Sequence, residues 1–216
     1  MTLAEWMEEN PSLSCKWDDE FNTNLLPEKI SSGSRKKVWW RCEKGHSWQA
    51  RVDSVVGLKS GCPYCNGKMV ARGENDLLSR NPAAALQWCG ELNKFLPDEI
   101  TAGSKKKVYW KCEKGHTWQA SVFSRGGKIN SNCPYCAGKR VLEGFNDLQT
   151  TNPRLASEWA HEFNGELLPT QVMKGSHKKV FWKCSEGHVW EAFIFARSKE
   201  NGTGCPVCAG RSAKNK

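Results

Sequence analysis

The chain has 216 residues, with 32 lysines and arginines against 23 aspartates and glutamates, so its formal net charge is +9. Such a basic chain favours an anionic partner, such as nucleic acid or an anionic membrane surface. No stretch offers the roughly 20 apolar residues of a membrane-spanning helix, and the acidic start, with Glu5, Glu8 and Glu9, does not resemble a signal peptide. We therefore expect a cytoplasmic protein without a membrane partner.

The 11 cysteines need an explanation, because thiols in the cytoplasm stay reduced. Their odd number also argues against a closed disulfide framework. Metal binding is the usual alternative for a cysteine-rich cytoplasmic chain.

Internal repeats organise the sequence. Asn-Pro pairs begin at Asn10, Asn81 and Asn152, which are 71 residues apart each time. A tryptophan, an asparagine, a proline, a Gly-Ser pair, a basic run, a Gly-His pair and a Cys-Pro-x-Cys motif follow at near-constant offsets. The pattern predicts three tandem modules, at residues 1–70, 71–140 and 141–211, and a basic tail at 212–216.

Each Asn-Pro pair predicts a helix start, because Asn is a good N-cap and Pro suits the first helical position. In the third module Leu155, Trp159 and Phe163 recur at i, i+4 and i+8, which predicts one apolar helix face. The first module has the same spacing at Leu13, Trp17 and Phe21. Prolines should end these helices, at Pro27, Pro97 and Pro169.

A Gly-Ser turn and a β-hairpin should follow in each module. With a period of two, Val108 and Trp110 should share the inner side with Trp118 across the Gly-His turn. The outer side then carries aromatic and charged residues. These are Trp39, Arg41, Gln49, Arg51 and Asp53 in the first module, Tyr109, Lys111, Gln119, Ser121 and Phe123 in the second, and Phe181, Lys183, Glu191, Phe193 and Phe195 in the third.

Two short segments, 71–80 and 141–151, lie between the copies, and each contains Asn-Asp-Leu. They are not rich in serine or glycine, so we expect ordered connectors, each with a short helix from Asn75 or Asn146.

Each module repeats one metal-ligand pattern, C-x3-H followed by C-P-x-C. The residues are Cys42, His46, Cys62 and Cys65, then Cys112, His116, Cys133 and Cys136, then Cys184, His188, Cys205 and Cys208. Three cysteines and one histidine form a closed tetrahedral site for structural zinc, so we expect three zinc ions. The alternatives are buried thiols, iron ligands, or a catalytic zinc, which would keep one coordination position open.

Four cysteine and histidine residues remain outside the pattern. Cys15 and Cys89 lie beside the repeated tryptophan and are expected to be buried free thiols. His161 and His177 occur in one copy only and are expected at the surface.

These motifs together, Asn-Asp-Leu, Asn-Pro, Gly-Ser-x-Lys-Lys-Val, Gly-His-x-Trp and Cys-Pro-x-Cys, resemble the bacterial and viral "probable zinc-ribbon" repeat, also called a treble-clef zinc finger domain. The resemblance implies arrays of small α+β zinc-stabilised modules, in some proteins beside restriction-endonuclease-like domains, and a DNA-binding role. It also implies an arginine seven residues after the Gly-His-x-Trp tryptophan. Arg125 and Arg197 match that position, whereas Val55 does not.

The name of the fold stays open between zinc ribbon and treble clef. A treble clef has a helix that begins at its last cysteine pair. The Ala-Gly-Lys-Arg-Val sequence after Cys136 instead suggests a knuckle followed by a strand.

The basic residues near the hairpins are candidates for contacts with nucleic acid. They are Arg35, Lys36, Lys37, Lys105, Lys106, Lys107, Lys111, Arg125, Lys178, Lys179, Lys183 and Arg197. Cations neutralise phosphates, and aromatic side chains stack on unpaired bases. Residues 76–147 and 148–216 carry 11−7 = +4 and 10−6 = +4, against 11−10 = +1 for 1–75, so the second and third modules should dominate binding.

Three functions remain open at this point. A non-enzymatic DNA-binding array is favoured, with nucleic acid as the partner and no small-molecule substrate. The second is an adaptor that recruits or inhibits a protein, including a nuclease in trans. An enzyme is the third and is not expected, because the sequence shows no catalytic constellation. The lysine runs can also be read as solvated turns, and the outer aromatics as packing groups.

Overall fold

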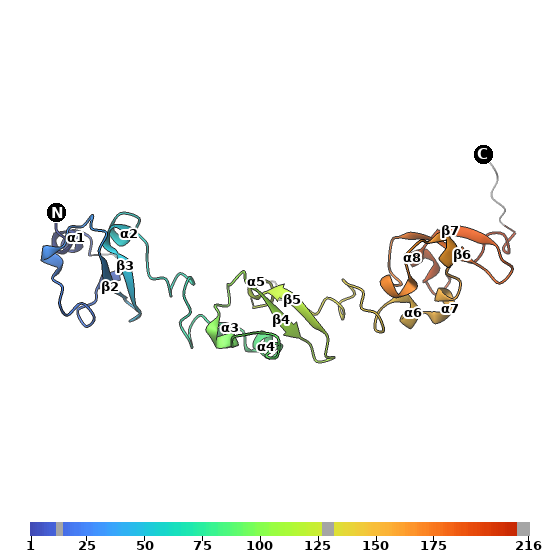
Figure 1. Cartoon of the computed structure of the whole chain (residues 1–216), viewed down its shortest axis with the longest axis horizontal. Helices are drawn as coiled ribbons and strands as arrows, with labels where there is room; N and C mark the ends of the chain where they lie inside the picture. Colours follow the sequence, from blue (N-terminus) through green and yellow to red (C-terminus); the bar gives the residue numbers. More distant parts are fainter. Residues whose placement is uncertain (12–14, 127–131, 211–216) are drawn as a thin grey trace. The chain divides into compact units, whose positions relative to one another are not determined.

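The computed structural model describes residues 1–11, 15–126 and 132–210, which form two compact units, Met1–Asn130 and Ser131–Lys216. Each module contributes one antiparallel hairpin (Figure 1). The hairpins are β2 (Lys37–Cys42) with β3 (Ser47–Arg51), β4 (Lys107–Lys111) with β5 (Thr117–Ser121), and β6 (Lys179–Lys183) with β7 (Val189–Phe193). No described helix has the length and apolar character needed to cross a membrane.

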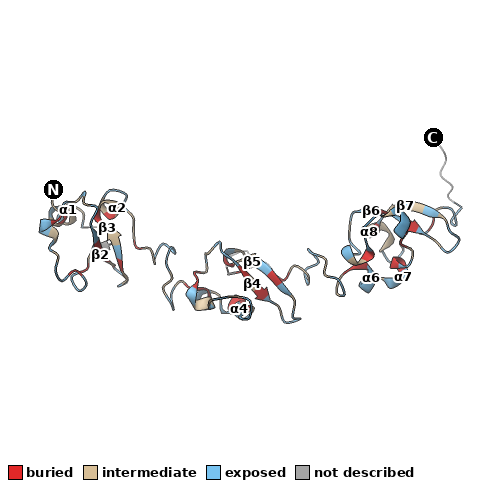
Figure 2. Ribbon diagram, in the orientation of Figure 1, coloured by how far each residue is buried: buried red, intermediate tan, exposed pale blue. Residues whose placement is uncertain are grey.

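All three hairpins have the same register, with one tryptophan opposite another. The pairs are Trp40 with Trp48, Trp110 with Trp118, and Trp182 with Trp190. The inner face is buried as predicted: Val108 is 2% exposed and Trp110 is fully buried (red on β4 in Figure 2). The buried indole N–H of Trp110 donates to the Ala120 carbonyl at 3.1 Å, so the tryptophan leaves no unpaired donor in the core.

A short helix follows each hairpin directly, which the sequence patterns did not predict. These helices are α2 (Val52–Val56), α5 (Val122–Gly126) and α8 (Ile194–Arg197). Each places a fully buried aliphatic residue in the core: Val52, Val122 or Ile194.

A second set of helices begins the modules: α1 (Leu3–Glu9), α3 (Leu77–Arg80) and α6 (Leu148–Thr151). The helices expected in the connectors therefore exist, but their N-caps are Asp76 and Asp147 rather than the asparagines. Their first residues, Leu77 and Leu148, are fully buried, and the Leu77 amide donates to the Ile100 carbonyl at 2.9 Å. These helices are therefore core elements of the modules that follow them.

The helices at the second and third Asn-Pro pairs, α4 (Pro82–Ala85) and α7 (Pro153–Ala156), are only one turn long. Their predicted caps are confirmed, since the Asn152 side chain accepts from the Leu155 amide. The predicted i, i+4, i+8 helix face is wrong. Trp159 leaves the helix and bridges to Trp182 on the hairpin, and Phe163 is 54% exposed in η3 (His161–Phe163). Pairing with the open hairpin edge satisfies the backbone there and replaces further helix.

In the first module the same segment forms a third strand, β1 (Cys15–Trp17), beside β2. Trp17 therefore lies on a strand and not on the predicted helix, and Leu13 lies outside the described residues. The repeated prolines begin short 3-10 helices rather than ending α-helices. These are η1 (Pro27–Lys29), η2 (Pro97–Glu99) and η4 (Pro169–Gln171).

Candidate metal centres and the surfaces around them

The first ligand pair of each module lies at the hairpin turn. In the first module the Cys42 amide donates to the His46 carbonyl at 3.0 Å, and the Gly45 amide donates to the Cys42 carbonyl at 2.9 Å. Gly45 has a φ of 85°, a conformation that side chains disfavour, which explains the Gly-His motif. The turn therefore holds the Cys42 thiol and the His46 imidazole together.

The second ligand pair lies on a tight knuckle. The Asn66 amide donates to the Cys62 carbonyl at 3.0 Å, and Gly67, with a φ of 68°, closes the turn. The knuckle is as predicted, but the strand expected after it is absent from the described residues. In the first copy the chain continues in turns until α3 begins at Leu77, so no helix starts at the cysteine pair.

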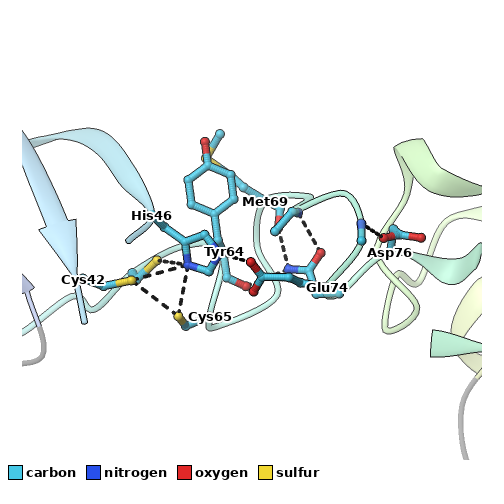
Figure 3. Close-up of polar contacts among 11 residues, drawn as sticks. Cys42, His46, Tyr64, Cys65, Met69, Glu74 and Asp76 are labelled. Atoms are coloured by element: carbon cyan, nitrogen blue, oxygen red, sulfur yellow. Dashed lines mark hydrogen bonds and ion pairs between the residues drawn. The ribbon is translucent and has the colours of Figure 1, made fainter. Parts of the chain in front are cut away.

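The first site has the dimensions of a tetrahedral zinc centre (Figure 3). The His46 Nδ1 lies 3.4, 3.6 and 3.4 Å from the sulfurs of Cys42, Cys62 and Cys65, and the Cys42 and Cys65 sulfurs are 3.8 Å apart. A tetrahedral zinc with ordinary bond lengths would set these separations at about 3.5 Å for N to S and about 3.8 Å for S to S. The donor set therefore fits zinc.

The other two sites repeat this arrangement. In the third module the His188 Nδ1 is 3.4 Å from the Cys184 sulfur, 3.8 Å from that of Cys205 and 3.4 Å from that of Cys208. In the second module the ligand atoms of Cys112, His116, Cys133 and Cys136 all lie within 4.8 Å of one another. All 12 predicted ligands thus form three Cys3His sites, consistent with three structural zinc ions.

The thiols of a site differ in acidity. Burial alone would raise the pKa of the Cys42 thiol, but hydrogen bonds from the backbone amides of His46 and Lys44 outweigh it and lower that pKa to about 7. Burial and the neighbouring Cys62 and Cys42 thiols raise the pKa of Cys65 to about 11. Three adjacent thiolates repel one another, so the set ionises fully only around a cation. When bound, zinc supplies that charge and with it folding free energy.

A carboxylate lies behind the first site. Glu74 Oε1 is 3.1 Å from the Nε2 of His46, on the side of the ring away from the sulfurs (Figure 3). The sequence patterns did not reveal this contact, because Glu74 lies in the connector, 28 residues after the histidine. A carboxylate in this position fixes the orientation and tautomer of a zinc-bound histidine.

The predicted phosphate contacts of Arg125 and Arg197 need correction, because the structure buries both side chains. Arg125 is 2% exposed, and the Arg197 side chain is 6% exposed. The Arg197 guanidinium lies 4.7 and 4.8 Å from the ring centroids of Trp182 and Trp190. It also pairs with Glu158 at 2.8 Å, so it stabilises the core by cation–π and ionic contacts rather than facing a partner.

The remaining predicted cations are exposed or half-exposed. The basic runs, with Arg35, Lys36, Lys37, Lys105, Lys106, Lys107, Lys178 and Lys179, lie exposed at the entry to each hairpin. Lys111 and Lys183 lie further along and face acidic partners, Glu91 at 3.5 Å and Glu162 at 3.4 Å. The basic runs are therefore the better candidates for phosphate contacts.

For three of the four cysteines and histidines outside the metal pattern, the structure shows the predicted burial or exposure. Cys89 is 2% exposed, as expected for a buried thiol, whereas the side chain of Cys15 is not among those described. His161 and His177 are exposed, and His177 stacks on Phe195 with ring centroids 4.5 Å apart.

Repeated hairpins closed by Cys3His centres define a class of small zinc-stabilised modules. A family model described as "Probable Treble clef zinc finger domain" matches residues 13–68, 84–139 and 155–211. The chain therefore belongs to this family, in three copies.

Two relatives share part of the chain. An Escherichia phage T5 protein named "Putative endonuclease" is 25% identical over 111 residues, which cover 51% of this chain and 35% of the relative. The "SPbeta prophage-derived uncharacterized protein YomD" of Bacillus subtilis (strain 168) is 36% identical over 90 residues, which cover 41% of this chain and 29% of the relative. The chain thus matches about a third of the length of each relative.

Proposed function

We propose that this protein is a non-enzymatic, cytoplasmic array of zinc modules, bounded as the repeats predict, that binds DNA through the hairpins of its second and third modules. The observation that carries the proposal is the exposed basic run beside exposed aromatic side chains. Zinc would act as scaffold, and the surface would bind the partner. The phage T5 relative, named as an endonuclease, is consistent with a link to nucleic acid.

The second module shows the surface chemistry clearly. The Lys106 ammonium lies 3.9 Å from the ring centroid of Phe95, and Lys105 and Lys107 are exposed on either side. Phe123 lies on α5, directly after the hairpin rather than on the strand as predicted, and is 47% exposed. Cations for phosphates and apolar rings for sugars or bases therefore lie within one surface.

The first module keeps one pair of outer rings, since Phe21 stacks on Trp39 with centroids 4.8 Å apart, but it has no phenylalanine directly after the hairpin. Asp53 replaces the phenylalanine found at the equivalent positions 123 and 195, and the Arg51 side chain forms an ion pair with it. The Arg51 guanidinium is the main cause of the lowered Asp53 pKa, and the charge of Arg35 also contributes. Asp53 thus offsets positive charge near the basic run, which supports a minor role in binding for this module.

The test is a charge reversal in the second module. Lys106→Glu with Lys107→Glu should weaken binding to labelled DNA and flatten its dependence on salt, because two phosphate contacts are lost. The matched control is Lys16→Glu with Lys29→Glu, which changes two exposed lysines of the first module by the same charge. Unchanged affinity in the first variant, with three zinc ions bound, would contradict the proposal.

A protein adaptor is the second candidate, and one repeated feature favours it. The leucine before each repeated proline is exposed: Leu26 by 54%, Leu96 by 58% and Leu168 by 42%. Exposed apolar residues at matching places are typical of protein interfaces. Salt separates the two candidates, because an interface built on leucines would weaken little as salt rises, whereas phosphate contacts weaken steeply.

A further inference from the structure

The third module carries a set of rings, here called the aromatic stripe: the exposed Phe163, Phe181, Phe193 and His177, and the half-buried Phe195 on α8. The rings form two contacting groups, with centroids 5.9 Å apart for Phe163 and Phe181 in the first, and 5.5 Å for Phe193 and Phe195 and 4.5 Å for His177 and Phe195 in the second. Phe181 and Phe193 lie on paired strands and alternate with the buried Trp182 and half-buried Trp190, so they face the outer side of the hairpin.

These rings are not part of the core. Phe163, Phe181 and Phe193 are 54%, 36% and 38% exposed, whereas the core of the same module is built from fully or nearly fully buried residues such as Trp182 and Ile194. Several phenyl rings exposed to water lower the solubility of a protein and do not contribute to its free energy of folding. Several exposed rings on one module are typical of a binding surface.

Lysines flank the stripe and identify the chemistry of its partner. The Lys179 ammonium lies 5.1 Å from the Phe193 ring centroid, and the Lys199 ammonium lies 5.4 Å from that of Phe195. Lys178 is exposed at the same end of the hairpin. Glu191, 3.7 Å from Lys179, offsets one of these charges, and both partners of that pair are about half exposed. The end of the stripe near His177 therefore combines ring faces with excess positive charge.

From this combination we infer that the aromatic stripe binds unpaired bases, so the nucleic acid bound by this protein is single-stranded DNA or an unpaired segment of it. This inference rests on the proposed function. Bases in a duplex are already stacked on one another, whereas unpaired bases expose both faces to rings such as Phe181 and Phe193. Lysines beside those rings follow the phosphates of the same strand.

The experiment compares single-stranded and duplex DNA of equal length on the zinc-loaded full chain. Single-stranded DNA should bind at least about tenfold more tightly, because stacking contributes on the order of 1–3 kcal/mol per base. Phe181→Leu with Phe193→Leu should remove most of that preference while leaving the salt dependence unchanged, because leucine keeps apolar contact but cannot stack. The matched control is Leu168→Ala, an exposed apolar residue outside the stripe.

The possible outcomes distinguish a failure of this inference from a failure of the proposed function. Duplex binding equal to or tighter than single-strand binding would overturn the inference and leave the proposed function standing. Leucine variants that keep the full single-strand preference would also overturn it. Failure to bind either form at low salt, with three zinc ions present, would reject the proposed function itself.

An independent observation, the Glu74 contact, carries a second inference. The connector after the first module is fixed by its own hydrogen bonds, in which the Asn75 side chain donates to the carbonyls of Tyr64 at 2.7 Å and Met69 at 2.9 Å. The next connector repeats this through Asn146, which donates to Tyr135 and Arg140. The position of Glu74, however, is occupied there by Phe145, so the sequence gives the second site no carboxylate at this place.

We propose that Glu74 is a positioning residue for the zinc of the first module and that metal binding there orders the connector at residues 71–76. With Nδ1 on the metal, Nε2 carries the proton and donates a hydrogen bond to the Glu74 carboxylate. The carboxylate thereby resists rotation of the imidazole away from the ion. It also ties the connector, which leads to the Asp76 cap of α3, to the occupied site.

Zinc release to a chromophoric chelator tests this proposal. Glu74→Ala should accelerate the release of one of the three zinc ions by about tenfold or more and raise hydrogen exchange in residues 71–76. Glu143→Ala, an exposed glutamate of the next connector, is the control and should leave both measurements unchanged. In a Cys65→Ser background, which lacks the first zinc, Glu74→Ala should have no further effect on release. Unchanged release of all three ions would overturn the proposal.

Discussion

The first and third modules have the same fold but different side chains at the centre of their cores. In the third module Arg197 lies against two tryptophans and pairs with Glu158. In the first, the equivalent positions hold the fully buried Val55 and the exposed Lys16. The acid and the arginine are therefore replaced together, which leaves no unpaired charge. In the second module the buried Arg125 donates instead to Gln87, so the centre can be apolar or hold a cation whose partner is an acid or an amide.

The modules also differ outside the core. The first adds β1 and a seven-residue α1, whereas in the third α6 spans four residues and no third strand forms among the described residues. Both modules have a pair of outer rings, Phe21 with Trp39 and Phe163 with Phe181, but the third adds Phe193 and Phe195 where the first has Arg51 paired with Asp53. The first module thus has more secondary structure, whereas the third has more aromatic side chains on its outer surface.

The largest expected effect in either module is loss of a metal ligand. Cys65→Ser should unfold the first module and Cys208→Ser the third, because each removes one of the four ligands that close a zinc site. Metal analysis should show two zinc ions instead of three in each variant, and hydrogen exchange should increase in the altered module only. Loss of all three ions would show that the sites are not independent.

The next largest effect concerns the two different centres. Arg197→Ala should lower the free energy of unfolding of the third module by about 3 kcal/mol, because it leaves Glu158 without its partner and opens a space between two tryptophans. Hydrogen exchange across α8 and β6 gives the measurement.

Exchanging the paired residues between the modules tests why their centres differ. Arg197→Val with Glu158→Lys copies the first module and should recover part of the loss. Val55→Arg alone should destabilise the first module strongly, because it buries a charge without an acid. Equal stability of Arg197→Ala and the wild type would contradict the structural role given to this arginine.

A smaller effect is expected at the helix start of the third module. Asp147 accepts from the Thr150 amide and hydroxyl and from the Gly144 amide at 2.7–2.8 Å. Burial opposes its charge, but these hydrogen bonds outweigh burial and lower the pKa of Asp147. Because the pKa is lowered, the charged cap stabilises the fold at pH values above the ordinary pKa of an aspartate. This stabilisation is lost as the pH falls through the lowered pKa of Asp147. At pH 7 Asp147→Ala should cost about 1 kcal/mol in thermal unfolding.

The matched variant in the first module is Thr2→Ala. Thr2 caps α1 with a neutral hydroxyl that accepts from the Glu5 amide at 3.2 Å. Removing it should cost a similar amount. A loss below the experimental error for both variants would show that these caps do not stabilise the modules.

The smallest expected effect is at the free thiol. Cys89→Ala should change the free energy of unfolding by less than about 1 kcal/mol and should keep all three zinc ions. The third module already has a fully buried alanine, Ala160, at the equivalent place. Loss of zinc from Cys89→Ala would show that this thiol takes part in metal binding.

The metal ligands and the two faces of each hairpin could be predicted because both depend on local spacing. The C-x3-H and C-P-x-C patterns reflect tight turns, and alternation along the strands separated Trp110 from Tyr109 correctly. The Asn caps were likewise local and predictable. The helix predicted through Trp159 failed because the backbone there pairs with a hairpin edge that is distant in sequence.

The arginines were misread for a related reason. Their place in a basic chain suggested phosphate contacts, whereas contact with two tryptophans from the hairpin buries them. The sequence contains no clear signal, because the position of Glu158 holds Gln87 beside Arg125 in the second module and Lys16 beside Val55 in the first. The Glu74 contact had no signal either, because only one of the connectors carries the acid.

Hydrogen exchange of the zinc-loaded chain, with and without single-stranded DNA, tests whether the second and third modules bind DNA. We expect protection at the basic runs and outer strands of these modules, around Lys105–Lys107 and Lys178–Phe181, with little change in the first. Protection confined to the first module, or no protection at DNA concentrations that saturate binding, would contradict the proposal.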